Sequence, residues 1–496
     1  MPQLLKVLLS VVLVPLLLLL LSIDSPFYEI WGRVDSSWFF TAGKAWMEGM
    51  VPYVDFSDSK GPLLWLIYGV GYLLSNNDFV GVWILTCVGY LVTFWFIYGI
   101  SRVFVDSRCL SFLVAVLMLW VYFNPVVHYE TKSEDFCQPF IAMSMWSVCR
   151  VLYCRPVSHS ALASMLRCGA WLTGISIGAT LLIKFTLAMM ITFFALILCF
   201  DARRSRALSV GGVTWRVGAG VAIVCLPFVI WFACLGNMDD FVNEYFVFTA
   251  KISSHSLRLN VVGWLLGGGF LSGLMVVMSL STGAVFLMAR RHAWVPLVAF
   301  GWFLVITVQN AEWVYYYNGC LIFAVFGLVA LAALLSKLSR SKVLKVALSV
   351  IALAGTEWAS LSHASGLANF KFADHHGDPL RAMGGEFYRH VDVVGRVKQP
   401  RIVFFNYNNK VNVADATGGL PGCKYWAKQY GAKGMQEVQF WQIKKKKPHF
   451  IYVKKGDFKS RERVESLGYF CLLQPGEFYE AYLYVSPQLK TLYPEY

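Results

Sequence analysis

Residues 32–75 read GRVDSSWFFTAGKAWMEGMVPYVDFSDSKGPLLWLIYGVGYLLS, and they decide how the rest of the sequence is interpreted. They follow the first apolar segment and place Asp35, Asp55, Asp58 and Lys60 among tryptophan, phenylalanine and tyrosine residues. Ionisable side chains at the edge of a bilayer are costly to place and often serve a function, and aromatic side chains favour that interface. We therefore interpret the stretch as a functional loop at a membrane surface.

The composition is typical of a chain that crosses a membrane many times. Of its 496 residues, 57% are hydrophobic and only 15% are charged, and the apolar residues come in long runs. The segment 364–496 holds 20 of the 43 Lys and Arg residues. No basic stripe with base-stacking aromatic residues stands out in the sequence, so the net charge of +14 does not indicate nucleic-acid binding. We attribute the excess of Lys and Arg over Asp and Glu to the orientation of the chain in the membrane and to affinity for anionic headgroups.

Two domains are expected, a transmembrane domain at 1–363 and a soluble domain at 364–496. A membrane-spanning helix needs about 20 apolar residues, although several runs are shorter. The first run lacks the small-x-small cleavage site of a signal peptide, so we expect it to remain as a span. The predicted spans are 1–23, 79–100, 109–123, 137–154, 169–183, 185–200, 217–235, 261–289, 293–308, 314–335 and 346–363.

The run 61–75 decides the topology. If it is an outer-face or re-entrant helix, the inner loops hold sixteen Lys and Arg residues and the outer loops before residue 364 hold seven. The positive-inside rule then favours eleven spans, with the amino terminus inside and the soluble domain outside. Residues 24–78 become one large outer loop. The same count splits 169–200 at Lys184, which either extends its charge to the interface or binds an anionic headgroup.

The predicted outer loops are acidic. They hold fourteen carboxylates against two in the inner loops, and acidic residues contribute little to topology. A polar cavity open to the outer face would account for the difference. Glu134 and Asp135 in the second outer loop either line an acceptor site, bind a cation, or form a solvated loop.

The segment 364–496 is predicted to form a small α/β domain. Its predicted elements are strands at 401–407, 450–453 and 480–485 and a helix at 460–467. We expect Lys444 to Lys447 in an exposed loop, with phospholipid contact as the alternative. If the domain lies outside the cytoplasm, Cys423 and Cys471 are the one plausible disulfide pair.

The segment after Asp35 has helical spacing. Trp38, Phe39, Trp46 and Met47 form an apolar face, which we expect to lie on the membrane. Asp35 stands where an N-cap is expected, and an ordinary cap would share its carboxylate with backbone N–H groups. A carboxylate held there can also act as a base.

This arrangement resembles the membrane glycosyltransferases of the GT-C fold. The pattern is similar to that of the protein O-mannosyltransferase and lipid A aminoarabinose transferase group. It consists of Asp35, a short amphipathic helix ending near Gly49 with the sequence MVPY, an acidic residue, Lys60, and Pro62 opening an apolar helix. Bacterial relatives in this group build surface polysaccharides. The specific motifs lie mainly in residues 32–64.

The resemblance implies an all-α polytopic membrane domain of about eleven helices, with interfacial helices in the first outer loop and a small extracytoplasmic α/β domain. It also implies transfer of a sugar from a polyprenyl-phosphate donor. Asp35 matches the group's first-loop acid, which is proposed to act as general base, and Lys60 matches a lysine near the donor phosphate. Two departures argue against assuming a mannose or aminoarabinose substrate: Ser36 replaces a second acid, and DSKGP has one proline, with its acid at Asp58.

The residues also suit this chemistry on their own. A hydroxyl that attacks an anomeric carbon needs a carboxylate to take its proton, and the leaving phosphate needs cations. Asp35 suits the first role, while Lys60, Lys184 and Lys251 suit the second. A single displacement of this kind would invert the anomeric centre.

Other residues are weaker candidates for substrate binding. His255, beside Lys251, either contacts phosphate or belongs to a lipid-facing basic loop. Glu312 and Tyr316 form either a platform for a sugar or part of an interfacial aromatic belt. The candidate substrate-binding residues are Asp55, Asp58, Glu134, Asp135, His255, Glu312 and Tyr316. No spacing favours a metal, and the group is largely metal-independent, so we expect neither a metal nor a cofactor.

The sequence therefore predicts a hexosyl- or pentosyltransferase of a bacterial cytoplasmic membrane. Its partners would be a polyprenyl-phosphate-linked sugar, a glycan, lipid or protein acceptor, and membrane lipids, in cell-envelope or surface polysaccharide synthesis. The alternative is a transporter or flippase of lipid-linked sugars, which would place charges midway along spans and show two similar halves. Here the charges gather at the ends of the predicted spans.

Overall fold

The structure is a computed structural model, in which the chain divides into two compact units. The helical unit comprises Met1–Ser22, Thr86–Trp231 and Ser256–Ser365, and the mixed unit comprises Ile23–Leu85, Phe232–His255 and Gly366–Tyr496. The residues that the structure describes are 3–26, 34–76, 78–123, 130–154, 158–250, 319, 321–338, 379–407, 411–428, 434–477 and 479–495. The predicted spans 261–289, 293–308 and 346–363, and the predicted boundary at 363/364, lie outside them.

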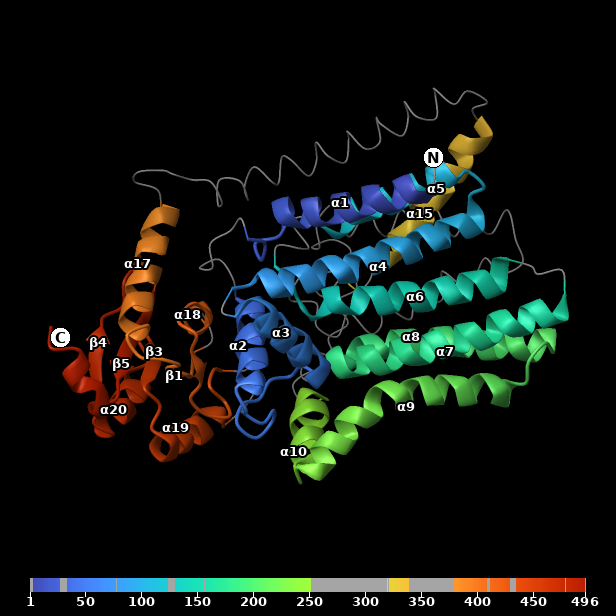
Figure 1. Cartoon of the computed structure of the whole chain (residues 1–496). Helices are drawn as coiled ribbons and strands as arrows, with labels where there is room; N and C mark the ends of the chain where they lie inside the picture. The colour runs from blue at the N-terminus through green and yellow to red at the C-terminus, as the bar shows by residue number, and fades with distance from the viewer. Residues whose placement is uncertain are drawn as a thin grey trace. The chain divides into compact units, whose positions relative to one another are not determined.

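The long helices occur where the sequence predicts spans (Figure 1). They are α1 (Gln3–Leu21), α4 (Val80–Phe104), α5 (Arg108–Tyr122), α6 (Ser133–Tyr153), α7 (His159–Ile183), α8 (Phe185–Ser205), α9 (Val210–Cys234) and α15 (Ala324–Leu338). Within the described ranges, α1, α4, α7, α8 and α9 are long and apolar enough to cross a membrane. The chain is therefore a multi-pass membrane protein.

The helical unit confirms the predicted break at Lys184. This residue is extended, with φ −151° and ψ 96°, and it ends α7 and precedes α8. The two helices pack against each other and against α6 (Figure 1). A single 32-residue helix is excluded because Lys184 leaves the helical conformation.

In the mixed unit, α2 (Asp35–Met47) packs closely on α3 (Pro62–Ser75). The contact depends on Gly43, because a Cβ there would lie 2.5 Å from the backbone nitrogen of Gly69. Phe39 packs edge-on against Tyr68, with 5.6 Å between ring centroids, and the Met47 side chain lies over Gly69. At 14 residues, α3 is shorter than the ~20 that a perpendicular span requires.

The prediction that the apolar face of α2 lies on the membrane is wrong for several of its residues. Phe39 is buried and Met47 is half-buried against α3. The Trp38 ring lies 5.0 Å from that of Trp426 in the carboxy-terminal domain. The face was assigned to lipid because helical spacing shows which residues share a face but not what covers them.

The carboxy-terminal part of the mixed unit is an α/β domain, as predicted. Its five-stranded sheet has the order β2-β1-β3-β5-β4, in which β1 is parallel to β2 and β3, and β5 is antiparallel to β3 and β4. The strands are β1 (Arg401–Phe405), β2 (Leu420–Pro421), β3 (Phe450–Lys454), β4 (Phe470–Leu473) and β5 (Ala481–Val485). The helices are α17 (Pro379–Val394), α18 (Asn412–Ala416), α19 (Met435–Lys446), α20 (Phe458–Ser466) and the 3₁₀ helix η6 (Pro487–Leu492). Nearly all residues of β1 and β3 are buried, as expected for central strands covered on both faces.

Two predictions for this domain need correction. Lys444 to Lys446 form the last turn of α19 and Lys447 its C-cap, not a loop, and cations at a helix carboxyl end are favourable. Cys423 and Cys471 are free. Cys423 follows β2 and Cys471 lies on β4, at opposite edges of the sheet, roughly 19 Å apart at ~4.8 Å per strand. A disulfide needs Cα atoms within about 7 Å.

The packing of α2 on α3 is testable at Gly43. Gly43→Ala should destabilise the protein by about 1–3 kcal/mol, because the new Cβ meets backbone atoms that cannot turn away. Thermal unfolding in detergent measures the change. Gly385→Ala in α17 is the matched control, since nothing lies within 4 Å of its Cβ position. Equal thermal midpoints for the two variants would contradict the close packing.

Candidate active site in the first loop

Asp35 is the first residue of α2 and is half-buried. The predicted N-cap assignment is wrong by one residue, because Val34 occupies the cap and provides no side-chain cap bond. A carboxylate in the first turn still faces the positive end of the helix dipole, which favours its ionised form. The helix therefore holds the Asp35 carboxylate at a defined place, and a general base requires such a fixed position.

The polar side of α2 faces the carboxy-terminal domain. Ser37 Oγ donates to Asp415 Oδ2 at 2.8 Å, and Lys44 Nζ donates to the carbonyl oxygen of Gly418 at 2.5 Å. These residues are seven apart, two helical turns along one face. The helix that carries Asp35 is thus attached to α18 and the turn that precedes β2.

Tyr53 shapes the segment between the two helices. It is fully buried and has φ +66°, a left-handed conformation that is uncommon for a residue with a side chain. Its backbone N–H donates to the carbonyl of Phe56 at 2.7 Å, and its hydroxyl donates to the carbonyl of Lys60 at 2.9 Å. The sequence shows Tyr53 only as one aromatic among several, so this role was missed; the MVPY motif was its only signal.

Lys60 is half-buried, two residues before α3. Its Nζ donates to Ser59 Oγ at 3.3 Å and lies 5.8 Å from the centre of the Phe39 ring. Asp58 accepts from the backbone N–H of Ser59 at 2.6 Å and is buried. The cation of Lys60 is therefore presented from a folded turn rather than from a loose loop.

Asp55 has structural partners on both oxygens. One oxygen accepts from the backbone N–H of Val51 at 3.0 Å, and the other forms a 3.1 Å ion pair with Lys446 of α19. The carboxylate closes its own turn and connects that turn to the carboxy-terminal domain. Its predicted role in substrate binding remains a prediction.

In the helical unit, the structure brings together three other predicted residues. Lys184 Nζ donates to Glu134 Oε1 in an ion pair that is largely shielded from solvent. Asp135 accepts from the hydroxyl of Tyr90 and, at 2.7 Å, from the backbone N–H of Lys132. Glu134 and Asp135 are buried, so the alternative of a solvated acidic loop is wrong. The sequence could not show this, because Lys184 lies 50 residues from Glu134.

Four predicted site residues lie outside the described residues: Lys251, His255, Glu312 and Tyr316. In the part of the chain that is described, no three His, Cys, Asp or Glu side chains are arranged to hold a metal ion. The expectation of no metal and no cofactor stays a prediction.

Lys44 is a buried cation beside the loop, and its pKa is strongly shifted. Burial lowers its pKa from 10.5 to about 8, although the carboxylates of Glu48 and Asp415 raise it in part. The amine can donate to the Gly418 carbonyl in its protonated or its neutral form, so loss of the proton keeps this contact and removes the cost of burying the charge. The contribution of Lys44 to stability is therefore expected to change with pH in the alkaline range.

These features together define the class of fold. Apolar helices, a first loop with two short helices and a small carboxy-terminal sheet domain form the GT-C fold of membrane glycosyltransferases, as predicted from residues 32–64. ArnT from Cupriavidus metallidurans bound to undecaprenyl phosphate is similar over 97% of both chains, with a TM-score of 0.60 and 12% identity. ArnT in the apo state covers the same shares, with a TM-score of 0.58 and 13% identity.

A second solved protein has a similar fold. The Archaeoglobus fulgidus oligosaccharyltransferase, in complex with Zn and sulfate, matches 97% of this chain and 73% of its own, with a TM-score of 0.51 and 14% identity. No model of a protein family matches the sequence, and no curated protein matches it either. At these identities the likeness establishes the fold.

The buried charge on Lys44 predicts a pH dependence. The unfolded chain keeps the Lys44 proton up to about pH 10.5, whereas the folded chain releases it near pH 8. Between these values the unfolded state binds more protons, so the contribution of Lys44 to stability should rise with pH. Below pH 8 the folded state carries the full cost of burying the charged Lys44 ammonium group. Thermal midpoints at pH 7.5 and 9.5 measure this contribution as the difference between the wild type and Lys44→Met, because buried thiols with a raised pKa, such as that of Cys423, oppose it equally in both proteins. The change from pH 7.5 to 9.5 should be more favourable in the wild type. The exposed Lys447→Met is the control and should keep the wild-type pH dependence, and the same pH dependence in Lys44→Met as in the wild type would exclude Lys44 as a contributor.

The ion pair between Lys184 and Glu134 predicts non-additive stability. Lys184→Met leaves a buried carboxylate without its cation and should destabilise the protein by about 3–5 kcal/mol. The double variant Lys184→Met/Glu134→Gln should recover most of this loss, as measured by thermal unfolding in detergent. A double variant as unstable as Lys184→Met would show that the pair is not what stabilises this region.

Proposed function

We propose that the chain is a membrane glycosyltransferase that moves a sugar from a polyprenyl-phosphate donor to a glycan, lipid or protein acceptor. The observation that carries the proposal is the likeness in fold, over 97% of both chains, to ArnT, which has been solved with undecaprenyl phosphate bound. A polyprenyl phosphate is what remains of such a donor after its sugar has been transferred. The same lipid product would therefore fit this fold.

Asp35 is the proposed general base. Its carboxylate lies in the first turn of α2, where the helix dipole favours the ionised form that accepts a proton. The acceptor hydroxyl would lose its proton to Asp35 as its oxygen bonds to the anomeric carbon and the bond from that carbon to the phosphate oxygen breaks. One displacement of this kind inverts the anomeric centre.

Lys60 is the proposed cation for the donor phosphate. Negative charge grows on the phosphate as the bond to the sugar breaks, and a fixed cation stabilises it. Tyr53 fixes the Lys60 backbone, so the cation is held in place before the donor arrives. Lys184 and Lys251 are proposed as further phosphate contacts, and Asp55, Asp58, Glu134, Asp135, His255, Glu312 and Tyr316 as substrate contacts.

The proposed setting is the outer face of a bacterial cytoplasmic membrane. The excess of Lys and Arg in the inner loops supports an amino terminus in the cytoplasm and a carboxy-terminal domain on the outside. Fourteen carboxylates on the outer side support a polar reaction site there. The product would belong to the cell envelope or to a surface polysaccharide.

The base role is tested with Asp35→Asn. Transfer should fall by about a hundredfold to ten-thousandfold, because the amide cannot accept the proton, while binding of undecaprenyl phosphate stays as in the wild type. Transfer is measured with purified protein as polyprenyl phosphate released from a lipid-linked sugar. Asp78→Asn, a change to another acid of the predicted first loop, is the matched control. Full transfer by Asp35→Asn would remove Asp35 from the mechanism.

A further inference from the structure

Glu244 is a buried carboxylate outside the predicted site. It follows α10 (Met238–Phe241) on a short π-helix, η2 (Val242–Phe248), and the residue is only 9% exposed. π-Helical turns are rare and often occur at functional sites. The sequence DDFVNEYFVF shows nothing unusual at Glu244, so only the structure singles it out.

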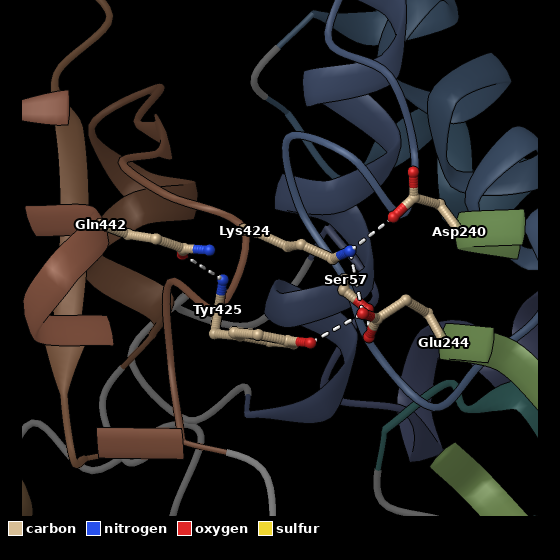
Figure 2. Close-up of polar contacts among 6 residues, drawn as sticks. All are labelled: Ser57, Asp240, Glu244, Lys424, Tyr425 and Gln442. Carbon is tan, nitrogen blue, oxygen red and sulfur yellow. Dashed lines mark hydrogen bonds and ion pairs between the residues drawn. The ribbon is translucent and has the colours of Figure 1, made fainter. Parts of the chain in front are cut away.

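Glu244 joins three segments that are far apart in the sequence (Figure 2). One of its oxygens accepts from Ser57 Oγ at 2.9 Å, and the other accepts from Tyr425 Oη at 2.7 Å and from Lys424 Nζ at 2.8 Å. The backbone N–H of Ser57 also donates to the carbonyl of Lys424 at 2.8 Å. The first loop, η2 and the carboxy-terminal domain thus meet at one carboxylate.

The strength of this junction comes from burial. Lys424 also pairs with Asp240 at 2.9 Å, but the Asp240 side chain is 43% exposed, and exposed pairs contribute little. Hydrogen bonds to a buried charged group contribute more, and losing that group leaves its donors without an acceptor. Burial and the Glu244 carboxylate both raise the pKa of Tyr425, so its hydroxyl stays a neutral donor.

The junction lies three residues before Lys60. After Ser57 is held by Glu244, the carbonyl of Ser59 accepts from Thr249 Oγ1 at 3.4 Å, just beyond η2. The carbonyl of Lys60 then accepts from Tyr53. The turn 57–60 presents the lysine, and hydrogen bonds hold it at Ser57, Ser59 and Lys60.

We infer that Glu244 is a positioning residue for Lys60: it fixes the turn 57–60 so that the Lys60 cation meets the donor phosphate. The inference rests on the proposed function, in which Lys60 binds that phosphate. Glu244 itself takes no part in bond making or breaking. Its role is to connect the carboxy-terminal domain to the turn through Ser57.

The position of the turn can be measured without any assay of function. In Glu244→Ala, amide hydrogen exchange of residues 57–60 should speed up by about tenfold, the worth of one hydrogen bond to a charged group. Glu244→Gln, which keeps size and an acceptor oxygen, should show a smaller effect in the same direction and serves if the alanine variant does not fold. Asp240→Asn is the matched control, because it removes the charge of the other carboxylate that pairs with Lys424, and it should leave the exchange of residues 57–60 unchanged. Unchanged exchange in both Glu244 variants would overturn the inference.

The link to Lys60 is tested with undecaprenyl phosphate as the probe. Glu244→Ala should weaken its binding by about fivefold when Lys60 is present and have no further effect in Lys60→Met, because acting through Lys60 makes the two changes non-additive. Equal weakening in both backgrounds, or wild-type affinity in Lys60→Met, would overturn the inference. A wild-type protein that does not bind undecaprenyl phosphate would instead overturn the proposed function, while the exchange experiment still decides whether Glu244 holds the turn.

Discussion

Helix α2 is held from two sides, and the placement of both proposed reacting groups depends on it. On one side, Gly43 lets its backbone meet that of Gly69 in α3. On the other, Lys44 reaches the carbonyl of Gly418 in the carboxy-terminal domain. Asp35 begins this helix, and the Lys60 turn leads directly into α3. The proposed base thus lies on a packed helix and the proposed cation on a turn directly before one, and such fixed placement is what a site that stabilises a transition state requires.

Buried charge follows the same logic in both units, because a charge inside apolar surroundings persists only with a partner. In the helical unit, Glu134 is paired with Lys184 between α6 and the break that separates α7 from α8. In the mixed unit, Glu244 is paired with Lys424 and supports the first loop. Such pairs cost more than apolar packing of the same volume, so their presence in a chain this hydrophobic supports a role in function rather than in stability alone.

The sequence predicted what local patterns determine. The long apolar runs gave the helices, the count of positive charges gave the break at Lys184, and the runs RIVFF and FIYV gave two central strands. The strands β2 and β4 and the helices α17, α18 and α19 were missed. Of these, β2 has only two residues and the polar surface of α19 has little periodicity. The partners of Glu244 could not be predicted, because Ser57 and Tyr425 lie 187 and 181 residues away. The lipid-facing assignment of Trp38 failed for the same reason, since its partner Trp426 is distant in sequence.

The central claim is that the chain cleaves a polyprenyl-phosphate sugar instead of moving it intact. A strain lacking the protein should accumulate the lipid-linked sugar, and that lipid can be given to purified protein in vesicles together with the acceptor fraction. Mass spectrometry should then detect free polyprenyl phosphate in an amount equal to the glycosylated acceptor, and none without acceptor. Lipid-linked sugar that crosses the vesicle membrane but remains uncleaved would contradict the account and identify a transporter.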